Sequence, residues 1–159
     1  MNQLSLSKWL NLIIVIVGLC GLLVYAWIVP SLGQAMVANY PEFAFSYWPW
    51  LILIMITAVP CYIALAFGWK ISKNIRDDHS FSTENAKLLK WVAVLAVADT
   101  GFFFVMNIVF LLLNMNHPGF VLIALILLII GIAISAVSAT LSHLIRKAAD
   151  LQEQSDLTI

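Results

Sequence analysis

The chain has 159 residues, of which 63% are hydrophobic and 10% charged, and its formal net charge is zero. Soluble domains contain roughly 45–50% apolar and about 25% charged residues, so this composition and a mean hydropathy of +1.00 exclude an ordinary soluble domain. The sequence has no clustered excess of Lys and Arg, which is the feature that would indicate direct binding to nucleic acid.

Four apolar stretches reach the length of about 20 residues that a helix needs to cross a bilayer. Because backbone groups in hydrocarbon must be hydrogen-bonded within their own segment, these stretches must be helices. We expect the first to stop at Pro30. The sequence predicts an all-α integral membrane protein, a four-helix transmembrane bundle forming one domain over residues 1–159. The spans are expected at about residues 9–29, 48–69, 88–113 and 120–141, with a tail over 142–159.

The basic residues predict the orientation of these spans. They occur before the first span, between the second and third, and after the fourth, whereas the other two loops have none. Cytoplasmic loops carry the excess of Lys and Arg, so both termini are predicted to be cytoplasmic. The eight residues are Lys8, Lys70, Lys73, Arg76, Lys87, Lys90, Arg146 and Lys147.

The segment from Pro30 to Tyr47 is the one sizeable extracytoplasmic piece. It is rich in aromatic and aliphatic residues and has Glu42 as its sole charge. We expect a short helix and turn on the membrane surface, which is either a lid or ligand-sensing surface or an interfacial plug. The second outer connection, residues 114–119, is expected to be a tight turn capped by His117.

The inner loop contains the signature of a helix start. Ser82 is predicted to be an N-cap whose hydroxyl accepts from the amide of Asn85 or Glu84, and Glu84 favours the positive end of the helix dipole. Phe81 precedes this cap. The neighbouring run Asp77–His79 offers three adjacent polar side chains without a fourth ligand, which argues against a metal site.

Asp99 is the one ionisable residue deep within a span. A charge there is costly, so we expect either a neutral carboxyl or an ionised one that water can reach. Matching depths along the other spans place residues 18–21, residues 60–62 and Ser135 near it. The structural interpretation is a carboxyl that hydrogen-bonds Tyr62, Ser135 or a carbonyl freed by Pro60, and the functional one is a proton-sensitive or ligand-binding site.

Other polar and small residues are predicted to face the interior of the bundle. Asn107 lies two turns after Asp99 on the same side of the third helix. Small residues spaced for close backbone approach mark a packing face on the fourth helix, and Gly18 and Gly21 offer the same on the first. The face on the fourth helix comprises Gly131, Ser135, Ser138, Ala139 and Ser142.

The sequence contains no recognisable catalytic constellation: no serine–histidine–acid set at a plausible depth, no HExxH, no glycine-rich phosphate loop and no CxxC. We therefore expect neither an enzyme nor a bound metal or cofactor.

The fourth helix is predicted to extend into the cytosol, since Leu144, Ala148 and Leu151 recur at helical spacing. The end of the chain, from Ser155, is expected to be extended. Its acidic and apolar residues could dock in a groove of a partner or form a frayed, solvated terminus. The docking candidates are Leu151, Asp156, Leu157 and Ile159.

Several segments, in their order and spacing, resemble the YoaS-like bacterial membrane proteins, a family of unknown function (number 2975). These are Tyr40–Ala44, the break at Ala58–Pro60, Phe81–Asn85 and the tail Asp150–Ile159. The resemblance covers nearly the whole chain and implies a small four-pass protein of the bacterial cell membrane. Genes of this family often adjoin one for a short helix-turn-helix regulator, which implies a membrane partner of a transcription factor.

Two functions follow as hypotheses. The first is a regulatory or sensing membrane protein that presents its cytoplasmic loop and tail to a DNA-binding regulator. The second is a small transporter or immunity-type protein that works through Asp99. Four spans are few for transport and no inverted repeat is visible, so the second hypothesis would favour a homo-oligomer.

Overall fold

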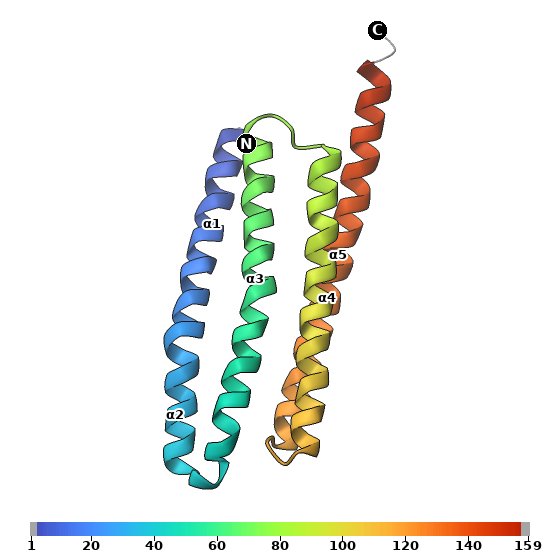
Figure 1. Cartoon of the computed structure of the whole chain (residues 1–159). Helices are drawn as coiled ribbons and strands as arrows, with labels where there is room; N and C mark the ends of the chain where they lie inside the picture. Colours follow the sequence, from blue (N-terminus) through green and yellow to red (C-terminus); the bar gives the residue numbers. More distant parts are fainter. Residues whose placement is uncertain (1–2, 157–159) are drawn as a thin grey trace.

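The computed structural model describes residues 3–156, which are helical apart from short turns (Figure 1). This confirms the all-α prediction. Four helical stretches in this part of the chain are long and apolar enough to cross a membrane. The elements are α1 (Gln3–Leu23), the π-helical η1 (Val24–Ile28), α2 (Val29–Asn39), the 3-10 helix η2 (Pro41–Ser46), α3 (Tyr47–Arg76), α4 (Thr83–Leu112) and α5 (Pro118–Asp156).

The first helix does not stop at Pro30, so that expectation is wrong. A proline ring clashes with the carbonyl four residues earlier and supplies no N–H. Here the chain widens into η1 just before the proline, and the amide of Val29 donates to the carbonyl of Val24, five residues back. This wider turn accommodates the ring, and α2 continues as helix to Asn39.

The expected break at Ala58–Pro60 is also absent, because α3 is helical through Pro60. Just before it, the Thr57 hydroxyl donates to the carbonyl of Ile54 at 2.7 Å. Polar side chains that bond nearby carbonyls are one way in which membrane helices tolerate an internal proline.

The helices pack in the order of the chain (Figure 1). α1 and α2 lie against α3, α3 lies against α4, and α4 lies against α5. Among residues 3–156, α1 has no close backbone contact with α4 or α5, and α3 has none with α5. The four spans therefore form an open row in which each helix touches its neighbours in sequence.

An open row buries few side chains, so most large apolar residues remain uncovered by protein. Lipid is the natural cover for them, because a multi-pass protein shows apolar surface to the bilayer. The buried apolar residues are Leu53, Ala86, Leu88, Ala93, Phe110 and Ala124.

The closest packing joins α4 to α5, as the small-residue face predicted. Gly131 is buried on α5, and a β-carbon built on it would overlap the side chain of Thr100 on α4. Ser138 is also buried, and the Ser142 hydroxyl donates to the carbonyl of Ala86 at 2.6 Å. Close backbone approach is what small residues allow in membranes.

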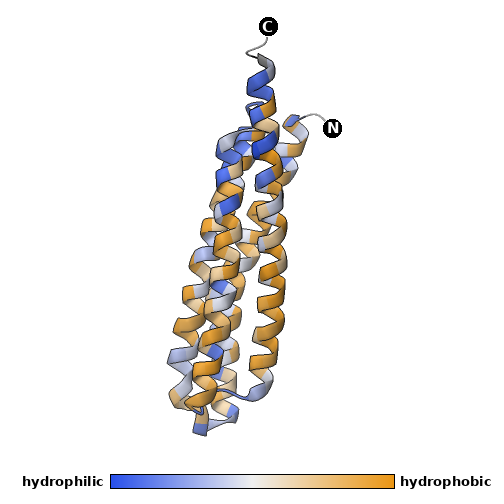
Figure 2. Cartoon of the chain, turned by 90° about the vertical axis from the view of Figure 1, so that its right-hand side faces the viewer, coloured by the Kyte–Doolittle hydropathy of each residue, from blue (hydrophilic) through white to orange (hydrophobic). Residues whose placement is uncertain are grey.

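The start of α1, the end of α5 and the α3–α4 loop lie at one end of the row, which we call the basic end (Figure 1). Hydrophilic residues gather there, next to a long apolar middle (Figure 2). The first described residues of α1 and the last described residues of α5 thus lie on the same side of the row. The assignment of that side to the cytoplasm rests on the basic residues.

Candidate functional site

The α3–α4 loop at the basic end has a defined conformation because the side chain of Asn85 forms hydrogen bonds with its backbone. Asn85 has no exposed surface. Its side-chain amide donates to the carbonyls of His79 and Ser80 at 3.1 and 3.0 Å, and its side-chain oxygen accepts from Asn74 of α3 at 2.8 Å. One buried side chain therefore joins α3, the loop and α4.

The predicted helix cap is confirmed. The backbone amide of Asn85 donates to the Ser82 hydroxyl at 3.2 Å, and α4 begins at Thr83. An N-cap of this kind satisfies one of the free amides at the start of a helix.

Glu84 lies in the first turn of α4, as predicted, and also connects to α3. Its carboxylate pairs with Lys70 at 2.7 Å and accepts from the Asn74 amide at 3.0 Å. These two hydrogen bonds, that from Lys70 first, lower the pKa of Glu84 below its ordinary value of 4.5. A depressed pKa means that the contacts persist at neutral pH and weaken as the pH falls through that lowered pKa.

Phe81 lies at the tip of this loop, next to the cap, and 59% of its surface is exposed. The loop around it is held by Asn85, so the ring is presented on a fixed backbone. The four residues predicted at this helix start therefore belong to one structural unit: Phe81, Ser82, Glu84 and Asn85. Together with Asn74, His79 and Ser80 they form what we call the Asn85 cluster.

A pair of hydrogen bonds at the basic end joins α1 to α3. The Ser7 hydroxyl donates to the carbonyl of Ser72 at 2.9 Å, and the Ser72 hydroxyl donates to the carbonyl of Ser7 at 3.1 Å. Both serines are buried. Sequence analysis did not identify Ser7, Ser72 or Asn74. Ser72 and Asn74 are polar residues in the last turns of the apolar helix α3, and this was the signal that could have identified them.

Asp99 lies beside Cys61, within the range 60–62 that the matched depths predicted, but its hydrogen bond is not one of those expected. It is half-buried on α4, and the Cys61 thiol of α3 donates to its carboxylate at 3.8 Å. Tyr62 instead donates its hydroxyl proton to the carbonyl of Gly18 on α1, at 2.9 Å, so the expected bond from Tyr62 to Asp99 is wrong. No hydrogen bond between Ser135 and Asp99 is present among the residues described.

Polar groups near Asp99 extend across the row. Tyr62 on α3 bonds the carbonyl of Gly18 on α1. Cys61 in turn reaches Asp99 on α4. Polar contacts from two adjacent residues of α3 thus link three spans.

Asn107 is fully buried on α4, as predicted. Its amide donates to the carbonyl of Phe103 at 2.9 Å, and its side-chain oxygen accepts from Asn116 at 3.0 Å. His117 caps the following turn, accepting at Nδ1 from the amide of Gly119 at 3.1 Å, which confirms the expectation for this residue.

The predicted tail is helical as far as the structure describes it. α5 runs to Asp156, beyond the ends of the other helices (Figure 1), so Ser155 and Asp156 are not extended as expected. Leu151 is 58% exposed. Leu157 and Ile159 lie outside the described residues. Between residues 3 and 156 no group of three His, Cys, Asp or Glu side chains could hold a metal ion.

Comparison with known proteins agrees with this membrane architecture. The chain is 26% identical over 161 residues to the uncharacterized membrane protein YoaS of Bacillus subtilis (strain 168), and the similarity covers all of both chains. No solved structure matches this chain. Residues 31–159 match the family described as protein of unknown function (DUF2975). With four-fifths of its length matched, this multi-pass membrane protein belongs to the DUF2975 family.

Proposed function

We propose that the protein is a regulatory membrane protein that presents the α3–α4 loop and the end of α5 to a cytoplasmic DNA-binding regulator of the helix-turn-helix type. The observation that carries the proposal is the exposed Phe81 ring on a loop held by buried Asn85. An aromatic side chain on a backbone that is already held loses less conformational entropy when it is bound, and aromatic residues recur as binding hot spots.

The end of α5 supplies the second half of this surface. It projects past the other helices at the same end as the loop (Figure 1) and carries Leu151 exposed to solvent. A helix with an exposed apolar residue and acidic neighbours suits recognition in a groove. We expect the signal that this protein senses to lie in the bilayer or at its surface, because the regions outside the spans are small.

Replacement of Phe81 by Ser tests the proposal, with Phe45→Ser as a matched control. Both rings are 59% exposed, but Phe45 lies in η2 at the opposite end. We expect a helix-turn-helix protein to co-purify with the tagged full-length wild type and the control, and to be lost from Phe81→Ser. Failure of the wild type to retain such a protein, or its retention by Phe81→Ser, would contradict the proposal.

Deletion of residues 156–159 tests the tail separately. The deletion touches no span, so insertion and thermal stability should not change, and co-purification should be lost. If the truncated protein retains the regulator at full affinity, the tail is not the docking element and the loop at Phe81 carries the contact alone.

The second candidate function is a transporter or immunity-type activity through Asp99. The Asp99 carboxyl, which lies within a span and accepts from Cys61 of the neighbouring helix, favours it, since intramembrane carboxyls often mark ion or proton paths. Substitution of Asp99, described in the Discussion, separates the two functions.

A further inference from the structure

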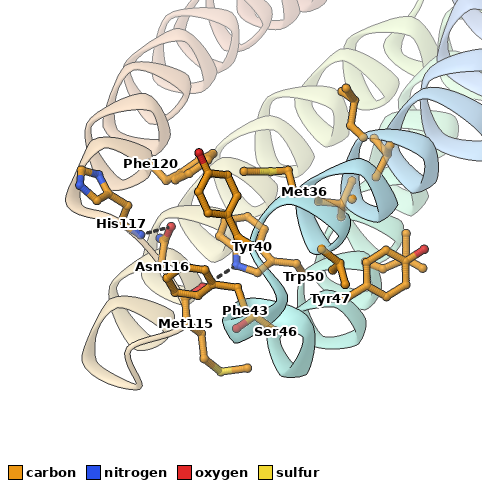
Figure 3. A pocket seen from close by; sticks show the side chains of 16 residues that line it. Met36, Tyr40, Phe43, Ser46, Tyr47, Trp50, Met115, Asn116, His117 and Phe120 are labelled. Atoms are coloured by element: carbon orange, nitrogen blue, oxygen red, sulfur yellow. Dashed lines mark hydrogen bonds between the residues drawn. The ribbon is translucent and has the colours of Figure 1, made fainter.

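The end of the row opposite the basic end contains a cavity of about 530 Å³. Its walls come from α2, η2, the start of α3, the α4–α5 turn and the start of α5, and Figure 3 shows their side chains gathered around Trp50. This volume lies within the range of small-molecule binding sites, about 300–1,000 Å³.

The lining is almost entirely apolar. Aromatic and sulfur-containing side chains make up much of it, and no Lys, Arg, Asp or Glu is among the lining residues. A buried charge without a partner is strongly unfavourable, so the cavity selects an uncharged occupant. The main walls are Met36, Tyr40, Phe43, Trp50, Met115 and Phe120.

Hydrogen bonds and ring contacts hold these walls in place. Trp50 donates through Nε1 to the carbonyl of Met115 at 3.0 Å, and its ring packs edge-on against Phe110 with centroids 5.4 Å apart. Asn116 is fixed by Asn107 and accepts from the amide of His117 at 2.9 Å. The cavity is therefore bounded by bonded groups and is largely pre-formed, as ligand sites usually are.

One polar group in the lining lacks a partner. Ser46 is 4% exposed, and its hydroxyl makes no hydrogen bond to any residue that the structure describes. Buried hydroxyl groups nearly always have a partner, and an exception calls for an explanation. The Ser46 hydroxyl oxygen is itself covered by neighbouring atoms, so this wall of the cavity does not offer that oxygen to an occupant.

We propose that this cavity binds an uncharged lipophilic molecule whose apolar body lies against the aromatic walls. The occupant is a free molecule of this class, reached from the membrane, and not a bilayer phospholipid. Binding stands on the cavity alone, whereas the idea that this molecule is the signal rests on the proposed regulatory function.

Photolabelling of the purified full-length protein in phosphatidylcholine nanodiscs tests the binding. The probe is a long-chain alcohol that carries a diazirine in its chain. We expect saturable labelling of peptides that line the cavity, competed by excess hexadecanol and not by the matching carboxylate at pH 8. Labelling that does not saturate, or equal saturable labelling by a phosphatidylcholine with the same diazirine chain, would overturn the proposal.

Val37→Trp fills the cavity from α2 and should lower labelling by about tenfold or more, as an overfilled site excludes its ligand. Val59→Trp is the matched control, because Val59 is 58% exposed on α3 and does not line the cavity; its labelling should equal that of the wild type. Leu32→Phe fills less space and replaces Val37→Trp if the latter does not fold. Normal labelling in folded Val37→Trp or Leu32→Phe would overturn the assignment of the site.

Ser46→Ala is a second control, because the Ser46 hydroxyl oxygen is covered by neighbouring atoms. Competition by hexadecanol and by hexadecane, which has no hydroxyl, should both equal that in the wild type. Weaker competition by hexadecanol alone would overturn the apolar character given to the site. Because these measurements do not involve a regulator, their failure leaves the proposed function standing, and failure of co-purification leaves the cavity assignment standing.

Discussion

The Cys61 thiol on α3 donates to the Asp99 carboxylate on α4 at 3.8 Å, and this pair links the two middle helices within the apolar part of the row. A thiol is a weak donor, and polar contacts between membrane helices average about 0.6 kcal/mol. The pair therefore orients Asp99 more than it stabilises the fold.

Asp99→Asn distinguishes a structural carboxyl from a functional one. If Asp99 is structural, the amide still accepts from Cys61, so the variant should insert normally and unfold within about 1 kcal/mol of the wild type. Thermal unfolding in detergent and co-purification of the regulator are the measurements. Loss of function in a well-folded Asp99→Asn protein, with partial activity in Asp99→Glu, would instead assign Asp99 to a titrating site.

Asn85→Ala should loosen the α3–α4 loop. The change removes the donors to His79 and Ser80 and leaves the Asn74 amide without this acceptor. Unsatisfied buried polar groups cost about 1–3 kcal/mol. We expect faster cleavage by trypsin after Arg76 and a lower unfolding temperature. Asn39→Ala is the control, since exposed Asn39 makes one bond, to the carbonyl of Ala35; equal effects of the two changes would refute the role given to Asn85.

Gly131→Ala should separate α4 from α5, because the added methyl group meets Thr100. Overpacking of this kind costs about 1–3 kcal/mol. Gly101→Ala is a close control: it is also a helical glycine, and a β-carbon there meets nothing within 4 Å. Unfolding of both variants in a denaturing detergent should show a clear loss for Gly131→Ala alone. Equal stability of the two would mean that the α4–α5 contact is less tight than described.

Single cysteines test the orientation, in a background with Cys20 and Cys61 replaced by Ala. A cysteine at Gln34 or His117 should react with an impermeant thiol reagent added outside intact cells, and one at Ser80 should react only after the membrane is opened. The reason is the restriction of Lys and Arg to the basic end. Labelling of the Ser80 position from outside would reverse the assignment.

The properties that the sequence determined by itself are those that depend on neighbouring residues. Runs of apolar residues specify the four helices, since an isolated backbone in lipid must bond to itself. The Ser82 cap is equally local, as it requires only Asn85 three residues later. Asn107 was also placed correctly on an inward face, because helical periodicity relates it to the residues one and two turns away.

Tertiary structure decided which distant residues meet. Matched depths gave residues 60–62 and Ser135 as possible neighbours of Asp99, but only the fold shows that Cys61 bonds Asp99 and that Tyr62 bonds Gly18. The same holds for the bond from Trp50 to Met115, 65 residues apart in the chain, which helps to form the cavity wall. Lipid is as apolar as a helix surface, so hydropathy alone could not distinguish an open row from a closed bundle. Packing between particular small and polar side chains made that choice.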